Sequence, residues 1–262
     1  MSALAGLVLA AGAGTRLRPL TLLLPKPLCP VNNVPLVDGA LERARALTAD
    51  IAVNVHHGRA LLEAHLAGRV HLSMEEREPL GTAGAVGHLR EWIDGRDLLV
   101  VNGDSWNDAS LTKLTDGWDG GRVRLLVVED PDRADFDGQW RFAGASLMPW
   151  EDVRSLEARP SGLYEVLWRD AFQAGRIELV ASEGAFFDCG TPSEYLAANL
   201  FASRGENVIG HGAKVEGRLE RCVVWPFGIV SAEESLRECI RAGRDTTVEA
   251  PLSDRFRALL SG

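Results

Sequence analysis

The stretch that decides the fold is LAGLVLAAGAGTR at residues 4–16, an apolar run that ends in a glycine-containing turn. The run Leu4–Ala10 carries no polar side chain, as expected of a strand covered by helices on both faces of a sheet. Gly12 and Gly14 follow at once, and glycine lets backbone N–H groups approach a phosphate closely. The stretch therefore predicts an α/β fold with an anion-binding loop after its first strand.

The residues that follow exclude two common phosphate-binding motifs. The Walker sequence GxxxxGK[ST] is absent from the chain. A dinucleotide-binding fingerprint requires a helix directly after the turn, but four prolines between residues 19 and 30 prevent a continuous helix there. The loop is thus long and stiffened by proline. It carries two cations, Arg16 and Lys26, which are suitable partners for a triphosphate.

Outward from this loop, short apolar runs alternate with amphipathic stretches. The pattern predicts strands at 51–55, 70–74, 98–101 and 123–128, separated by helices at 37–47, 58–66, 83–92 and 111–118. Beyond them it predicts a strand at 140–147, a helix at 162–174, a strand at 176–181 and a helix at 192–203. This order predicts a Rossmann-like, doubly wound sheet, in which ligands bind at the carboxyl ends of the strands.

The C-terminal segment has a different character. Residues 207–249 are rich in Val, Ile and Gly at roughly six-residue spacing, which is typical of a short β-solenoid. An irregular β-rich tail packed on the main domain is the alternative. We therefore predict a main domain at residues 1–203 and a tail at residues 204–262.

Composition restricts the classes of function. The formal net charge of −9 argues against a nucleic-acid polymer as partner. Four widely separated cysteines without a CxxC pair favour neither structural zinc nor a disulfide framework. The N-terminal apolar run is short and lacks a basic lead, so we expect a strand and not a signal peptide. No apolar run has membrane-spanning length. We expect a cytoplasmic protein with no membrane association.

Five segments together resemble the signature of the sugar-1-phosphate nucleotidyltransferase family. They are LAAGAGTRLRPLT at 9–21, PKPL at 25–28, GTAGA at 81–85, NGD at 102–104 and FDCGTP at 187–192. The resemblance spans residues 4 to about 200. In the tail, VVWP at 223–226 resembles the start of the left-handed β-helix of mannose-1-phosphate guanylyltransferases. The resemblance therefore implies a nucleotidyltransferase domain followed by a short left-handed β-helix-like tail.

The resemblance implies that a nucleoside triphosphate and a sugar 1-phosphate react to give a nucleotide sugar and pyrophosphate. It assigns Mg²⁺ to Asp104 and Asp188, and Mg²⁺ commonly takes one or two carboxylates together with phosphate oxygens. Arg16 is expected to bind the β- and γ-phosphates. Lys26 is expected to bind the α-phosphate or the sugar phosphate. Because the nucleophile is already an anion, catalysis is expected to depend on positioning and charge neutralisation.

The same resemblance distributes the remaining contacts. The sugar is expected to lie against Gly144, and the nucleobase near Gly81 and Thr82. Glu76 falls where a base-reading side chain is common, and an acceptor-only carboxylate suits guanine; the alternative is a solvated Glu76 within an acidic run. The backbone around the nucleotide is expected to come from Leu9, Ala10, Ala11, Gly12, Gly14 and Thr15.

The substrates are less determined than the class. We expect guanylyl transfer to mannose 1-phosphate or a related sugar, with uridylyl transfer to an amino-sugar or glucose 1-phosphate as the alternative. A catalytically silent nucleotide-sugar-binding paralogue is a rival of another class. The family's usual Glu-Lys-Pro segment is missing, and Arg133, Arg141 and Arg169 are the arginines that could replace its lysine. The sequence leaves open whether the tail mediates self-association into a homo-oligomer.

Overall fold

The computed structural model describes residues 3–260. The chain folds into two compact units, the first made of residues 3–12 and 37–186 and the second of residues 13–36 and 187–260. The linear division predicted at residues 1–203 and 204–262 stays a prediction, and its residues 1–2 and 261–262 lie outside the described part. Each unit is described by itself.

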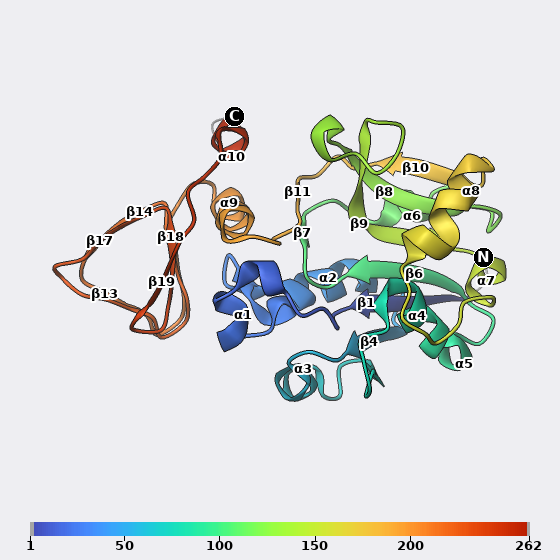
Figure 1. Cartoon of the computed structure of the whole chain (residues 1–262), viewed down its shortest axis with the longest axis horizontal. Coiled ribbons are helices and arrows are strands. Elements are labelled where there is room, and N and C mark those ends of the chain that lie inside the picture. Colours follow the sequence, from blue (N-terminus) through green and yellow to red (C-terminus); the bar gives the residue numbers. More distant parts are fainter. Residues whose placement is uncertain (1–2, 261–262) are drawn as a thin grey trace. The chain divides into compact units, whose positions relative to one another are not determined.

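The first unit is built on a seven-stranded sheet with the order β10-β8-β9-β6-β1-β4-β5 (Figure 1). Its strands are β1 (Leu4–Leu9), β4 (Ile51–Val55), β5 (His71–Met74), β6 (Asp97–Asn102), β8 (Val123–Glu129), β9 (Trp140–Met148) and β10 (Ile177–Ala181). Neighbouring strands run parallel except β9, which is antiparallel to both β6 and β8. The predicted α/β Rossmann-like fold is therefore confirmed, with one reversed strand in its sheet.

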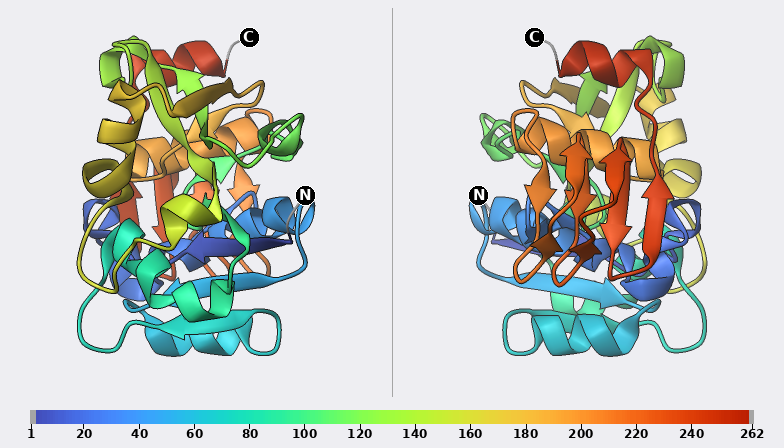
Figure 2. Two further views of the ribbon diagram at one scale, coloured as in Figure 1. Left: turned by 90° about the vertical axis from the view of Figure 1, so that its right-hand side faces the viewer. Right: turned by 90° about the vertical axis from the view of Figure 1, so that its left-hand side faces the viewer.

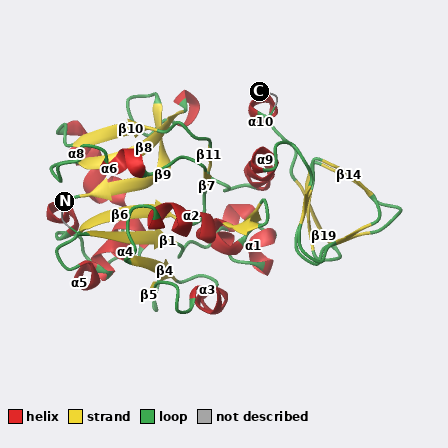
Figure 3. Ribbon diagram, turned by 180° about the vertical axis from the view of Figure 1, so that it is seen from behind, coloured by secondary structure: helices red, strands yellow, loops and turns green. Residues whose placement is uncertain are grey.

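Helices flank this sheet (Figure 3). They are α2 (Leu36–Arg45), α3 (Arg59–Leu66), α4 (Gly81–His88), α5 (Arg90–Ile93), α6 (Thr112–Thr115), α7 (Trp150–Val153) and α8 (Arg169–Gln173). The helix predicted at 111–118 is a single turn, because its C-cap residue Asp116 has an extended conformation with a ψ of 114°. The helix predicted at 162–174 begins with a π-helical turn, Tyr164–Trp168, before α8.

The core of this unit forms where α4 and α5 pack on β1, β6 and β8. Leu7, Val100 and Leu125 from the strands share one buried cluster with Val86 and Ile93 from the helices. Apolar side chains on the strands thus hold the helices in place, and the polar residues directly after the strands are left at the sheet's carboxyl edge.

The second unit contains the tail, a three-sided solenoid (Figures 1 and 2). Its strands are β12 (Val208–Ile209), β13 (Lys214–Val215), β14 (Arg218–Glu220), β15 (Val223–Val224), β16 (Ile229–Val230), β17 (Ser235–Arg237), β18 (Cys239–Ala242) and β19 (Thr246–Glu249). Val208 pairs in parallel with Val223, and Val223 with Ile240, so successive coils stack in register. Strand β19 closes the stack by pairing antiparallel with β18. The predicted β-helix-like tail is confirmed, while its left-handed sense stays a prediction.

The rest of the second unit joins this solenoid to the phosphate-loop segment. Helix α9 (Pro192–Ala202) starts at Thr191, whose side chain accepts a hydrogen bond from the Glu194 N–H. Proline at the first helical position favours this start. The smaller elements of the second unit are α1 (Leu20–Leu23), α10 (Asp254–Leu259), β2 (Pro30–Val31) and β3 (Val34–Pro35). Two short strands remain: β7 (Trp106–Asn107) belongs to the first unit, and β11 (Phe186–Phe187) lies where the first unit ends and the second resumes. Among residues 3–260, no helix has the length and apolarity needed to cross a membrane.

Candidate active site

The predicted phosphate loop forms a tight turn in the second unit. Gly14 has a left-handed φ of 59° and precedes a short 3-10 turn, Thr15–Leu17. A Cβ at Gly14 would lie 2.9 Å from the Cβ of Lys26, so only glycine permits this approach. The turn leaves Thr15 and Arg16 exposed, as a ligand-binding role requires.

Three of the predicted site residues meet in this unit although they are far apart in the sequence. The Arg16 guanidinium lies 3.1 Å from the carboxylate of Asp188. The Lys26 side chain is only 4% exposed, and its ammonium donates a hydrogen bond of 2.9 Å to the backbone carbonyl of Asp188. Gly190 makes room for this pair, because its Cβ would lie 2.7 Å from the Asp188 carboxylate and 2.9 Å from the Arg16 guanidinium. The result is a compact group of two cations and one carboxylate.

A thiol beside this cluster has no role in it. Burial raises the pKa of Cys29 to about 12, against the opposing effect of the nearby Lys26 charge. The thiol is therefore neutral at physiological pH and is no nucleophile. Cys29 therefore adds no nucleophile to the two cations and the carboxylate of the cluster.

The first unit places a second group of predicted residues at the carboxyl edge of its sheet. Leu9, at the end of β1, pairs with Asn102 at the end of β6, so the loops that carry Ala10, Ala11 and Gly12 and the loop that carries Asp104 start side by side. The Gly103 N–H donates to the Leu9 carbonyl at 2.8 Å, which fixes the turn before the half-buried Asp104.

Sequence reasoning missed a buried network that holds this edge. The Asn54 side chain accepts a hydrogen bond from the Ala10 N–H at 2.8 Å and donates one to Glu75 at 2.7 Å. The same Glu75 carboxylate accepts from the Leu80 N–H at 2.8 Å. Glu75 directly follows β5, a signal that could have identified it, whereas the predicted base reader Glu76 is exposed. Glu75 thus ties the β1 loop to the segment that opens α4.

The predicted nucleobase residues have structural roles as well. A Cβ at Gly81 would lie 2.5 Å from the Ser161 carbonyl oxygen, so glycine here permits close backbone packing. The Thr82 hydroxyl accepts a hydrogen bond of 2.7 Å from the Leu163 N–H. The start of α4 is therefore held against residues 161–163, and the contact of Gly81 and Thr82 with a base stays a prediction.

Gly144, the predicted sugar-facing residue, lies in an irregular part of β9. The register between β8 and β9 shifts there, as Leu125 pairs with Ser146 but Val127 pairs with Phe142. Gly144 has a φ of 78°. Bulges of this kind re-aim backbone and side chains next to functional sites.

The two predicted metal ligands belong to different units. Asp104 follows β6 in the first unit, and Asp188 follows β11 and lies in the second. Among residues 3–260, no group of three or more His, Cys, Asp or Glu side chains is suited to hold a metal. Two carboxylates suit Mg²⁺ nonetheless, because this ion prefers oxygen and completes its shell with phosphate and water.

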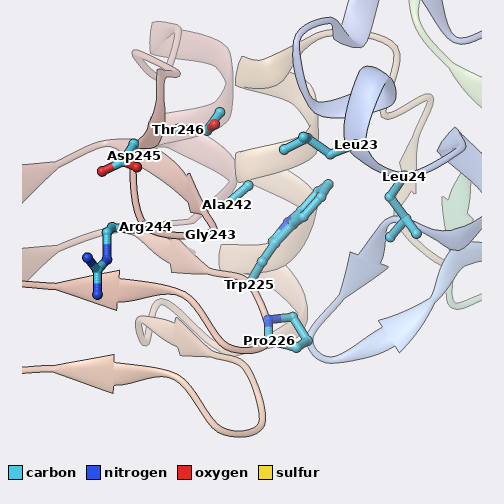
Figure 4. A pocket seen from close by; sticks show the side chains of 9 residues that line it. All are labelled: Leu23, Leu24, Trp225, Pro226, Ala242, Gly243, Arg244, Asp245 and Thr246. Carbon is cyan, nitrogen blue, oxygen red and sulfur yellow. The ribbon is translucent and has the colours of Figure 1, made fainter.

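A cavity of about 490 Å³ lies elsewhere in the second unit (Figure 4). Its apolar walls are Trp225 and Pro226 from the solenoid, Leu23 at the end of α1 and the next residue, Leu24. The remaining lining residues are Ala242, Gly243, Arg244, Asp245 and Thr246. The predicted site residues are not among them, so this cavity is separate from the cluster around Asp188.

The fold is shared with a solved structure. A protein of Thermus thermophilus described as a mannose-1-phosphate geranyltransferase matches with a TM-score of 0.72 and 18% sequence identity. The match covers 98% of this chain and 97% of that chain. The likeness defines the class of protein by fold, an α/β domain with a β-rich C-terminal part.

Sequence comparison identifies the family. Residues 5–120 match the nucleotidyl transferase family. The N-acetylmuramate alpha-1-phosphate uridylyltransferase of Caulobacter vibrioides is 32% identical over 227 residues, which are 73% of this chain and 94% of that protein. This chain belongs to the sugar-1-phosphate nucleotidyltransferase family.

A second relative carries a different substrate in its name. The mannose-1-phosphate guanyltransferase of Aspergillus fumigatus is 29% identical over 226 residues, covering 72% of this chain. The chain spans 62% of the length of that relative. Both relatives are nucleotidyltransferases by name, but the nucleobase and the sugar in the two names differ.

Proposed function

We propose that this chain transfers a nucleoside monophosphate from a nucleoside triphosphate to a sugar 1-phosphate, releasing pyrophosphate. The observation that carries the proposal is the cluster of Arg16, Lys26 and Asp188. A buried ammonium and an exposed guanidinium beside one carboxylate suit a polyphosphate, because both cations can neutralise phosphate charge.

The chemistry requires no general base. An oxygen of the sugar 1-phosphate attacks the α-phosphorus while the bond from that phosphorus to the β-phosphate oxygen breaks. The nucleophile is already ionised at neutral pH, and pyrophosphate leaves with the electron pair. Arg16 would stabilise the charge of the departing pyrophosphate, and Lys26 the charge at the α-phosphate. Positioning and charge neutralisation then supply the rate enhancement.

Asp104 and Asp188 would hold Mg²⁺, their carboxylate oxygens being the donors that this ion prefers. The ion, when bound, neutralises phosphate charge. The Asp188 backbone is held by Lys26, and the turn before Asp104 by the hydrogen bond from Gly103 to Leu9. The backbone at Asp188 and the turn before Asp104 are thus held by this chain's own hydrogen bonds.

For the substrates we propose GTP with mannose 1-phosphate or a related sugar. Two features support this: the exposed carboxylate of Glu76, which can accept from guanine N–H groups, and the VVWP segment of the solenoid at 223–226. The name of the Aspergillus relative agrees. The second candidate is uridylyl transfer, which the Caulobacter relative supports because 94% of that protein is covered.

The test is pyrophosphate release with Mg²⁺, with five nucleoside triphosphates measured against a set of sugar 1-phosphates. We expect strong turnover with one pair of substrates, GTP and a mannose-type sugar 1-phosphate. Asp188→Asn should lower that turnover by orders of magnitude, whereas Asp137→Asn, the same change at an exposed hairpin position, should not. If the protein binds a nucleotide but shows no turnover with any pair of substrates, the proposed activity is refuted and a catalytically silent nucleotide-sugar-binding paralogue is favoured.

A further inference from the structure

The first unit lacks the lysine that the family uses for the sugar phosphate. The chain has no lysine between Lys113 and Lys214. Lys113 is itself occupied by an ion pair of 2.5 Å with Glu183. A cation for the sugar phosphate in this part of the chain must therefore be an arginine.

Arg141 is held rigidly at the start of β9. Its guanidinium carbon lies 5.2 Å from the ring centroid of Phe186, in a cation–π arrangement. One of its nitrogens lies 3.5 Å from the carboxylate of Asp130. The Arg141 side chain is 14% exposed and that of Asp130 only 2%. The aromatic ring and the buried carboxylate thus fix the plane of the guanidinium.

Phe186 connects this arginine to the predicted sugar position. A Cβ at Gly144 would lie 3.5 Å from the edge of the Phe186 ring and 3.0 Å from the Ser105 hydroxyl. Ser105 directly follows Asp104 in the chain. The Phe186 ring therefore has Arg141 over its face and Gly144 at its edge.

A buried hydroxyl at the same place lacks a partner. Within residues 3–260, the Ser105 hydroxyl is buried and makes no hydrogen bond. A buried polar group without a partner is costly, and one beside a functional segment points to a ligand that satisfies it. A sugar hydroxyl over Gly144 would do so.

The other two arginines are placed less favourably. Arg133 pairs with the same Asp130 carboxylate at 3.4 Å, but its side chain is 40% exposed. Arg169 is 55% exposed and pairs with its sequence neighbour Asp170. The Arg169 pair is a surface ion pair between exposed side chains, which gives little preorganisation. Arg141 alone of the three is stacked on the ring that touches Gly144.

We propose that Arg141 binds the phosphate of the sugar 1-phosphate and thereby replaces the family's lysine. The assignment rests on the proposed function. Its guanidinium can present two parallel N–H donors to phosphate oxygens, a geometry that lysine lacks. Phe186 and Asp130 position the guanidinium before the substrate arrives, so little conformational freedom is lost on binding.

The experiment compares Arg141→Gln, Arg141→Lys and the matched control Arg133→Gln, which removes another partner of Asp130. We expect Arg141→Gln to raise the KM for the sugar 1-phosphate about tenfold or more, with the KM for the nucleoside triphosphate unchanged within about twofold. Arg141→Lys should restore part of the loss, because it keeps the charge but not the fork. Arg133→Gln should leave the KM for the sugar 1-phosphate unchanged.

A double variant separates binding from folding. Arg141→Gln leaves the buried Asp130 carboxylate with one partner fewer and can lower stability, whereas Asp130→Asn combined with Arg141→Gln removes that charge. The double variant should recover the melting temperature and keep the raised sugar KM. A sugar KM that returns to the wild-type value with the melting temperature would overturn the assignment, as would an unchanged KM in Arg141→Gln. A wild type inactive with every substrate pair would instead overturn the proposed function and this assignment with it.

Discussion

Replacing Tyr195 with phenylalanine should strongly destabilise the second unit. Tyr195 is fully buried in α9, and burial raises the pKa of its hydroxyl well above the usual value. The hydroxyl accepts a hydrogen bond of 3.0 Å from the Trp225 indole N–H and donates one to the Pro30 carbonyl. One oxygen atom therefore joins α9, the solenoid and the end of the loop that carries Lys26.

The expected magnitude follows from the two groups left behind. Phenylalanine fills the same space but leaves the indole N–H and the Pro30 carbonyl unpaired. An unsatisfied buried polar group costs about 1–3 kcal/mol, so Tyr195→Phe, which leaves two, should lower the free energy of unfolding by about 2–6 kcal/mol. That loss is large beside the roughly 5–15 kcal/mol that typically separates folded from unfolded protein.

Urea unfolding followed by tryptophan fluorescence measures this change. Tyr164→Phe is the matched control, since Tyr164 is the other of the chain's two tyrosines and is partly exposed. It should change stability by less than about 0.5 kcal/mol. A double-mutant cycle with Trp225→Phe should show strong coupling to Tyr195→Phe. A Tyr195→Phe variant as stable as the Tyr164→Phe control would refute the reasoning.

Three further predictions concern other parts of the site. Asn54→Leu leaves the Ala10 N–H unpaired, so it should lower the free energy of unfolding in urea titrations by about 1–3 kcal/mol. It should also raise the KM for the nucleoside triphosphate more than the KM for the sugar 1-phosphate. Equal effects on both KM values would contradict this. Gly144→Ala should raise the sugar KM and destabilise more than Gly138→Ala, which has the same sign of φ but open space around it; equal thermal shifts would argue against close packing at Gly144. The Cys29 pKa of about 12 lies above the ordinary value of 9.0, so the stability that this thiol contributes is complete below pH 9. This contribution is lost towards pH 12, at up to about 1.4 kcal/mol per pH unit. Cys29→Ala should therefore lose less stability than the wild type between pH 8 and 10, which urea titrations at both pH values can check.

Much of the fold could be predicted because it depends on local patterns. The apolar runs at 51–55 and 98–101 correspond to β4 and β6 within one residue at each end, since burial on both faces leaves few polar side chains in a strand. The solenoid likewise follows from its repeat, because each coil needs an inward apolar residue at the same position. Helix ends were predicted less well, because a single residue that leaves the helical conformation, such as the extended Asp116, ends a helix that periodicity alone would extend.

The direction of β9 could not be predicted. Its apolar pattern is the same whether the strand runs parallel or antiparallel to its neighbours. Only the pairing of Val101 with Ala145 and of Leu98 with Met148 establishes the reversed direction. The strand's bulge at Gly144 depends on this pairing too, because a register shift is a property of two strands and not of one sequence.

The candidate site, like the fold, was predicted only in part from the sequence. The sequence by itself determined which residue types follow each strand, and it identified Arg16, Lys26 and Asp188 through motifs. Only the tertiary structure showed that the carboxylate of Asp188 meets Arg16 across 172 positions of chain, and that Arg141 lies over the ring of Phe186. The physical reason is that hydrophobic periodicity fixes local conformation within a few residues, whereas contacts between distant segments depend on how the elements within each unit pack.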